Sequence, residues 1–119
     1  MATTMFDRYG GFAIVSKIVM AFYDRALDSD IIGGYFEDTD MKTLVDHQTK
    51  FISSVMGGPA SYSNEALQRV HAGLQIDRAA FDEMVALLAE TLEEFELEQD
   101  DVSEIVHAIK GRSVFIIGT

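Results

Sequence analysis

Apolar residues recur along this chain three and four positions apart, which is the period of an α-helix that buries one face. Between residues 12 and 28, for example, Ile18, Phe22 and Ala26 share a face with Ile14 and Val19. The same period predicts five helices, over residues 12–28, 40–56, 63–72, 78–95 and 100–116. No run alternates between apolar and polar residues as a half-buried strand does, so the predicted fold class is all-α.

Polar residues and glycines separate the predicted helices. Thr39 and Asp40 precede the second helix and Ser63 precedes the third, and side chains of this kind cap the first turn of a helix. Gly73 is expected to end the third helix. Paired glycines break the chain between helices at residues 10–11, 33–34 and 57–58.

The composition narrows the class of protein. At 119 residues with 48% of them apolar, the chain is predicted to form a single domain over residues 1–119. Its net charge of −11 argues against nucleic acid and an anionic membrane surface as partners. The absence of cysteine excludes disulfides and thiolate metal sites. The chain also lacks a secretory signal and an apolar run of the roughly 20 residues that span a bilayer, so a cytoplasmic location is expected.

Two polar residues lie at the edge of the apolar face predicted for the second helix. With Leu44 as the reference direction, Gln48 lies at about +40° and His47 at about −60° around the helix axis. A buried amide without a partner costs a few kcal/mol, so Gln48 requires an internal partner or a polar ligand. By spacing alone, His47 is either a boundary residue that bonds water, the more common case, or a group that faces an internal ligand.

The third predicted helix carries an inward histidine. Four of its neighbouring positions share one face at i, i+3, i+4 and i+7 spacing: Leu67, Val70, His71 and Leu74. A lone inward histidine is usually a core residue bonded to a backbone carbonyl. Two inward histidines on separate helices favour a shared ligand instead. Tyr23, at the edge of the first helix's apolar face, also requires a partner for its hydroxyl.

The remaining polar features of the helices do not indicate a site. Glu104 and His107 have the Glu-x-x-His spacing of di-iron helical bundles. A di-iron site needs a second such pair, and neither His47 nor His71 has a glutamate three residues earlier. His107 is therefore predicted to be solvated, and the acidic run over residues 89–101 is predicted to be a solvated helix end.

Five motifs occur in a characteristic order over residues 6–76: FDRYGG, AFYDRALDSDIIGGYF, TDMKTLVDHQTKF, GGPASY and RVHAGLQI. With these spacings the chain resembles the group 1 truncated haemoglobins, and among them the cyanobacterial-type members. The resemblance covers nearly the whole sequence. It implies a truncated, two-over-two globin-like helical sandwich that encloses haem.

The resemblance assigns roles to individual residues. It makes His71 the proximal iron ligand, which agrees with the inward direction of that side chain and with histidine as the usual globin ligand. It makes Tyr23 and Gln48 the hydrogen-bonding pair that stabilises bound oxygen, and it places Leu44 at the distal position and Phe36 on the haem face. The other haem contacts that it implies are Phe51, Leu67, Val70, Ile76, Phe81 and Met84.

Three further features of the resemblance concern haem binding. In cyanobacterial relatives, the histidine before the distal glutamine binds the iron when no gas is present, and His47 holds this position. The alternative is that His47 bonds a haem propionate at the pocket edge. The carboxyl-terminal GRSVFIIGT lacks the histidine that attaches haem in some members, so non-covalent haem b, iron protoporphyrin IX, is expected. Ile52 replaces the second of two phenylalanines thought to gate a gas tunnel, so that gate is not carried over.

The function implied is the binding of oxygen, and of nitric oxide, carbon monoxide or similar small ligands, with slow release of oxygen. The alternative is a nitric oxide dioxygenase or a peroxidase-type enzyme that uses the same haem. Such an enzyme would need an electron-donating reductase as a partner, because no flavin or nicotinamide domain is evident in the chain. A haem-free helical interaction module would require the tyrosine, the glutamine and the two inward histidines to be coincidental.

Overall fold

A computed structural model of the protein describes residues 4–36, 40–58 and 76–112. Their α-helices are α1 (Met5–Tyr9), α2 (Phe12–Leu27), α3 (Met41–Val55), α5 (Arg78–Glu94) and α6 (Gln99–Lys110). A short 3-10 helix, η1 (Gly33–Phe36), follows α2. No strand occurs in these three ranges, so the all-α prediction is confirmed. The helix predicted over residues 63–72, its cap Ser63 and its end at Gly73 lie outside the described residues.

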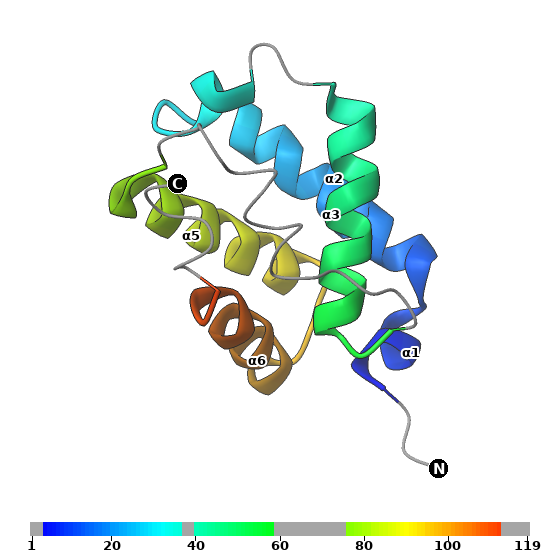
Figure 1. Cartoon of the computed structure of the whole chain (residues 1–119). Helices are drawn as coiled ribbons and strands as arrows, with labels where there is room; N and C mark the ends of the chain where they lie inside the picture. The colour runs from blue at the N-terminus through cyan, green and yellow to red at the C-terminus, as the bar shows by residue number, and fades with distance from the viewer. Residues whose placement is uncertain (1–3, 37–39, 59–75, 113–119) are drawn as a thin grey trace.

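The helix α2 is the centre of the fold, because α1, η1, α3 and α5 all pack against it. Figure 1 shows α3 crossing α2, while α5 and α6 lie beside one another as a second pair. The chain thus forms two packed helical pairs, α2 with α3 and α5 with α6. This is the two-over-two arrangement that the sequence predicted.

The buried face of α2 carries Ile18, Val19, Phe22 and Ala26 as the apolar period predicts, but Ile14 is only half-buried and Val15, which was not predicted, is fully buried. Its core residues are Val15, Ile18, Val19, Phe22, Tyr23 and Ala26. Opposite them, α5 buries Phe81, Val85, Leu88 and Leu92, and α6 buries Val102, Ile105 and Ile109. Side chains at i, i+3, i+4 and i+7 meet on one face, and burying that face supplies most of the stability of helices this short.

Local side-chain and backbone bonds set where the helices begin and end. The Asp40 side chain caps α3 and accepts hydrogen bonds from the backbone N–H and the hydroxyl of Thr43, as predicted. Asp77 caps α5 in the same way through the N–H of Ala80, at 2.8 Å. Gly10 adopts φ +113° at the end of α1, a conformation that glycine takes without a steric penalty.

Three elements differ from the sequence prediction. The short elements α1 and η1 were not predicted, since five and four residues are too few to show a helical period. The last helix ends at Lys110 and not at residue 116. Gly111 follows it directly, and glycine inside a helix costs about 1 kcal/mol relative to alanine; the predicted positions 113–116 lie outside the described residues.

Candidate functional site

The buried tyrosine of α2 is the best-defined polar residue of the predicted site. Tyr23 is 6% exposed, and its ring contacts two other aromatic rings. The ring centroid of Phe22 is 4.9 Å away and that of Phe36, from η1, is 5.6 Å away. Both contacts are edge-on, with interplanar angles of 69° and 81°. The structure thus joins Tyr23 and Phe36, two predicted site residues that lie 13 positions apart.

The helix α3 presents the predicted distal residues on the boundary of the core. Leu44, His47 and Gln48 are all half-buried, and Phe51 is buried. On the other side of the helix, Lys50 forms an exposed ion pair with Asp46 at 3.1 Å, whereas Ser53, farther along, is fully buried. The half-burial of His47 and Gln48 agrees with the edge position derived from helical geometry, whereas their roles stay predictions.

Apolar side chains around this region remain only partly covered. Phe81 is fully buried on α5, but Met84 and Ile76 at the same end of that helix are half-buried, as are Leu44 and Phe36. In the described part of the chain, α3 and α5 contact α2 extensively and contact each other little. The half-buried residues of α3, α5 and η1 therefore pack against the core at its edge.

Three of the predicted proximal residues lie outside the described residues. These are His71, Leu67 and Val70, so their roles rest on the sequence alone. Within residues 4–36, 40–58 and 76–112, no three histidine, aspartate or glutamate side chains gather as a metal site. His107 is exposed on α6, as predicted.

Polar bonds at the carboxyl end of α2 fasten the Tyr23 helix to α5. Arg25 donates a hydrogen bond to the fully buried hydroxyl of Thr91 at 2.8 Å and forms an ion pair with Glu94. Four residues later, the Ser29 hydroxyl donates to a carboxylate oxygen of Glu83 at 2.9 Å. Since α5 also carries Phe81 and Met84, these bonds position the two walls of the predicted pocket relative to one another.

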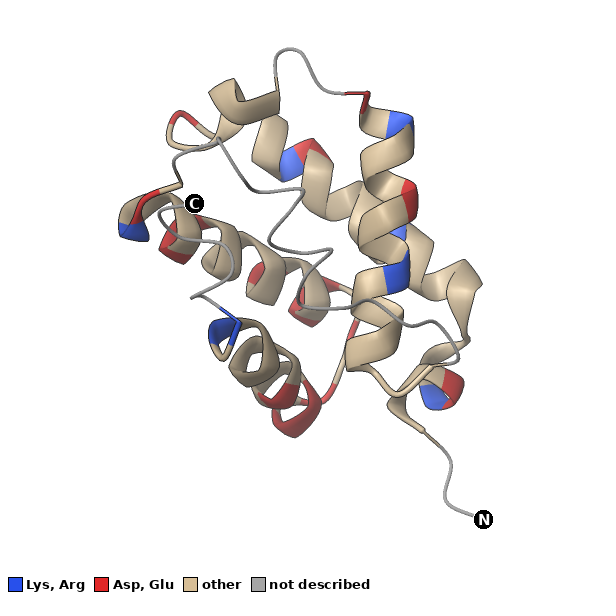
Figure 2. Ribbon diagram, in the orientation of Figure 1, with Lys and Arg blue, Asp and Glu red and all other residues tan. Residues whose placement is uncertain are grey.

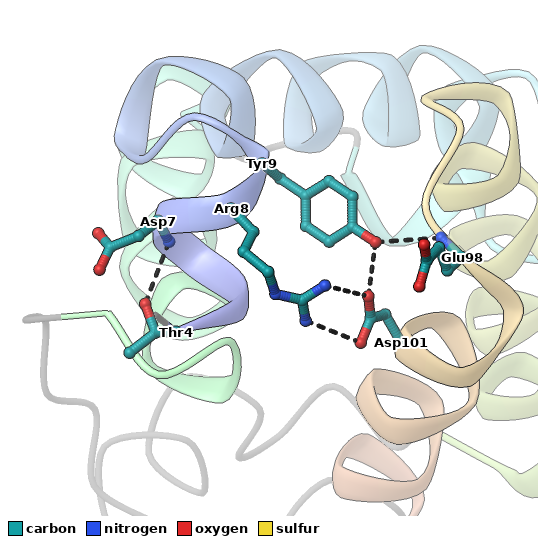
Figure 3. Close-up of polar contacts among 6 residues, drawn as sticks. All are labelled: Thr4, Asp7, Arg8, Tyr9, Glu98 and Asp101. Carbon is teal, nitrogen blue, oxygen red and sulfur yellow. Dashed lines mark hydrogen bonds and ion pairs between the residues drawn. The ribbon is translucent and has the colours of Figure 1, made fainter. Parts of the chain in front are cut away.

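The prediction of a wholly solvated acidic run over residues 89–101 was wrong at its last residue. Asp101 is 7% exposed and accepts two hydrogen bonds from Arg8, both at 3.1 Å (Figure 3). The hydroxyl of Tyr9 donates to the same carboxylate at 2.5 Å and accepts from the backbone N–H of Glu98 at 3.1 Å. The bonds from Arg8 and from Tyr9 hold the pKa of Asp101 below its usual value. Burial and the bond to Asp101 raise the pKa of Tyr9.

These bonds, which we call the Asp101 cluster, join α1 to the start of α6 (Figure 3). The sequence carries no signal for them, because the partners lie 92 and 93 positions apart. The rest of the acidic run is mostly exposed, and Figure 2 shows acidic residues at the beginning of α6 and along α5. None of the helices in the described ranges is both long and apolar enough to cross a bilayer.

Comparisons with known proteins identify the family. The profile of the family described as bacterial-like globin matches residues 4–116. A group 1 truncated haemoglobin, GlbN, from Mycolicibacterium paratuberculosis is 32% identical over 106 residues, which cover 89% of this chain and 78% of that protein. A group 1 truncated haemoglobin from Tetrahymena thermophila is 29% identical over 107 residues, which cover 90% and 88% of the two chains.

The solved structures agree with the sequence comparisons. The crystal structure of a truncated haemoglobin from Tetrahymena pyriformis, in the Fe(III) form, superposes with a TM-score of 0.89 and 26% identity. The match covers 98% of this chain and 100% of that one. The chain therefore belongs to the bacterial-like globin family, as a group 1 truncated haemoglobin with a two-over-two globin fold, a haem cofactor and small gaseous molecules as ligands.

Proposed function

We propose that the protein binds oxygen on haem iron held by His71, with Tyr23 and Gln48 as hydrogen-bond donors to the bound gas. The observation that carries the proposal is the burial of Tyr23, a hydroxyl-bearing ring 6% exposed beside Phe36. A phenol at such a position adds a polar group to an otherwise apolar wall. Small-ligand sites have this composition, with apolar linings and a few placed polar groups.

The described residues fit a haem group. Haem is a large, flat and mainly apolar molecule, and the half-buried side chains on three elements offer it an apolar lining: Phe36 on η1, Leu44 on α3, and Met84 at the start of α5, with Ile76 just before it. Phe51 and Phe81, which the resemblance also implies as haem contacts, are buried. The resemblance adds Leu67, Val70 and His71, which lie outside the described residues. The cofactor is non-covalent haem b in this proposal, since the stretch GRSVFIIGT lacks the histidine that attaches haem in some relatives.

The chain's residues determine how the gas is held. Haem iron supplies reversible binding of diatomic molecules such as oxygen, nitric oxide and carbon monoxide. The Tyr23 hydroxyl and the Gln48 amide would donate hydrogen bonds to oxygen held in this pocket, whereas Leu44 would provide none. Each such bond is worth about 1 kcal/mol or more where water is excluded, which corresponds to roughly a fivefold slower release.

His47 is proposed as the second iron ligand when no gas is present. Its support is its place on α3, half-buried, one position before Gln48 and three after Leu44. Residues three apart are neighbours on a helix surface, so His47 and Leu44 point toward the same region. Gas would then enter only after His47 has left the iron.

The test of the proposed function is oxygen dissociation from the ferrous oxygenated protein in wild type and Tyr23→Phe. The substitution keeps the ring and removes the donor, so the off-rate should rise at least about fivefold. Gln48→Leu should raise the off-rate in the same direction. Unchanged off-rates in both variants would contradict the proposal.

A parallel assay addresses the enzymatic alternative, which uses the same pocket. The oxygenated protein is mixed with nitric oxide, and nitrate formation is followed with and without a cell lysate as the source of a reductase. Binding without turnover is expected from the proposed oxygen-holding function. Repeated turnover that depends on the lysate would instead establish a nitric oxide dioxygenase with an external reductase.

A further inference from the structure

Phe22 lies beside Tyr23 on α2 and is buried, yet it carries no polar atom and has no part in the proposed haem contacts. Residues one position apart on a helix point about 100° away from each other and do not usually share a face. The two rings nevertheless meet edge-on with their centroids 4.9 Å apart. Their contact restricts the directions that the Tyr23 ring can take.

A second ring restricts Tyr23 from a different element. Phe36 in η1 meets it edge-on at 5.6 Å, and η1 packs against α2. Edge-on pairs at these distances are the favoured geometry of aromatic contacts. Tyr23 has only two side-chain torsions, so contacts with two rings leave its hydroxyl little freedom to move.

We infer that Phe22 is a positioning residue for the Tyr23 hydroxyl. The inference rests on the proposed role of Tyr23 as a donor to bound oxygen, and it adds the residue that directs this donor. A hydrogen bond weakens steeply when its angle falls below about 120°. A tyrosine whose ring tilts away from its partner therefore loses much of its effect, although its hydroxyl is still present. Phe22 acts on the gas only through Tyr23.

The test is a double-mutant cycle on oxygen dissociation from the haem-loaded ferrous protein. Phe22→Met keeps most of the buried volume and removes the ring, and Phe22→Leu serves as a second, independent variant. Each should raise the off-rate by between about twofold and tenfold, the range that an aromatic pair contributes. In a Tyr23→Phe background the same substitutions should have no effect, because no hydroxyl remains to be directed.

A matched control separates positioning from general loosening of α2. Val15→Ala also removes buried apolar atoms from this helix, where Val15 is fully buried but makes no ring contact with Tyr23. It should lower the unfolding temperature and leave the off-rate unchanged. An equal rise in the off-rate for Val15→Ala and the Phe22 variants would overturn the inference.

Ring motion provides a readout that does not depend on gas release. The chain has four tyrosines, so ring signals of Tyr23 can be assigned by NMR in the diamagnetic carbon monoxide complex with labelled tyrosine. Ring flips of Tyr23 should become faster in Phe22→Met and stay unchanged in Val15→Ala.

The outcomes distinguish the two proposals. Suppose that Tyr23→Phe raises the off-rate while the Phe22 variants change neither the off-rate nor the rate of Tyr23 ring flips. In that case only the positioning role of Phe22 is wrong. It is also wrong if the Phe22 variants act equally with and without the Tyr23 hydroxyl. If Tyr23→Phe itself leaves the off-rate unchanged, the donor role is wrong and the positioning role falls with it.

Discussion

Removing one hydroxyl from the Asp101 cluster should destabilise the protein measurably. In Tyr9→Phe the ring that packs beside the core remains, while the 2.5 Å hydrogen bond to the Asp101 carboxylate is lost. A hydrogen bond to a charged group contributes about 1.5–3 kcal/mol. The carboxylate keeps its partner Arg8, whose side chain is 43% exposed, and the N–H of Glu98 is exposed enough to bond water. These facts favour the lower half of the range, about 2 kcal/mol.

The predicted change in melting temperature follows from the chain length. The entropy of unfolding is about 2.1 cal/mol/K per residue, or about 250 cal/mol/K for 119 residues. A loss of about 2 kcal/mol therefore lowers the midpoint by about 8 °C. The assay is thermal unfolding followed by circular dichroism, with wild type and Tyr9→Phe at the same haem concentration, because ligand binding also shifts the midpoint.

The difference in melting temperature between wild type and Tyr9→Phe should depend on pH, and the pKa shifts of Asp101 and Tyr9 set the direction of that dependence. The folded pKa of Asp101 is lowered, so the stabilisation by this carboxylate is present above its unfolded pKa and is lost as pH falls through the folded value. The folded pKa of Tyr9 is raised, so its stabilisation is present below its unfolded pKa and is lost as pH rises through the folded value. The difference in melting temperature between wild type and Tyr9→Phe should be constant from about pH 5 to 9 and should become smaller at lower and at higher pH.

Two results would refute this reasoning. The first is a change of less than about 2 °C at neutral pH, which would mean that water replaces the lost bond at no cost. The second is an equal effect of Tyr9→Phe in an Asp101→Asn background. The bond is formed with the carboxylate, so its contribution should shrink when the charge is absent.

The remaining predictions concern the iron ligands and one backbone position. His71→Ala should abolish stable haem binding or leave an altered, weakly held haem, and a normal globin absorption spectrum in this variant would contradict the proximal assignment. Wild type should be low-spin in its ferric and ferrous states without gas, and His47→Ala should convert the spectra to high spin and speed gas binding, while His107→Ala on the exposed face of α6 should do neither. Glu96 has φ +65° at the exposed end of α5, so Glu96→Gly should stabilise the fold by up to about 1 kcal/mol, or about 4 °C. A lower midpoint would show that the glutamate side chain outweighs the backbone strain.

Local sequence determined which faces of the helices are buried and where several of them begin. The apolar period placed Phe22 in the core and Tyr23, His47 and Gln48 at its edge, since the period of a helix is a property of neighbouring positions. Asp40 was predicted as a cap for the same reason, because its partner lies three residues away. The family also followed from the sequence, because five motifs occur in a characteristic order and at characteristic distances from one another over residues 6–76.

Tertiary structure alone decided which side chains meet across the fold. The burial of Asp101 depends on Arg8 and Tyr9, and no periodic pattern relates residues more than 90 positions apart. From the sequence alone, an aspartate within an acidic run is predicted to be solvated, because burying an unpaired charge is costly. In the fold, the cation of Arg8 and the hydroxyl of Tyr9 pair with Asp101, so its carboxylate can be buried. The contact between the rings of Tyr23 and Phe36 was likewise not predictable from the sequence. Helical geometry directs the tyrosine inward, but its contact with Phe36 arises only when η1 packs back against α2.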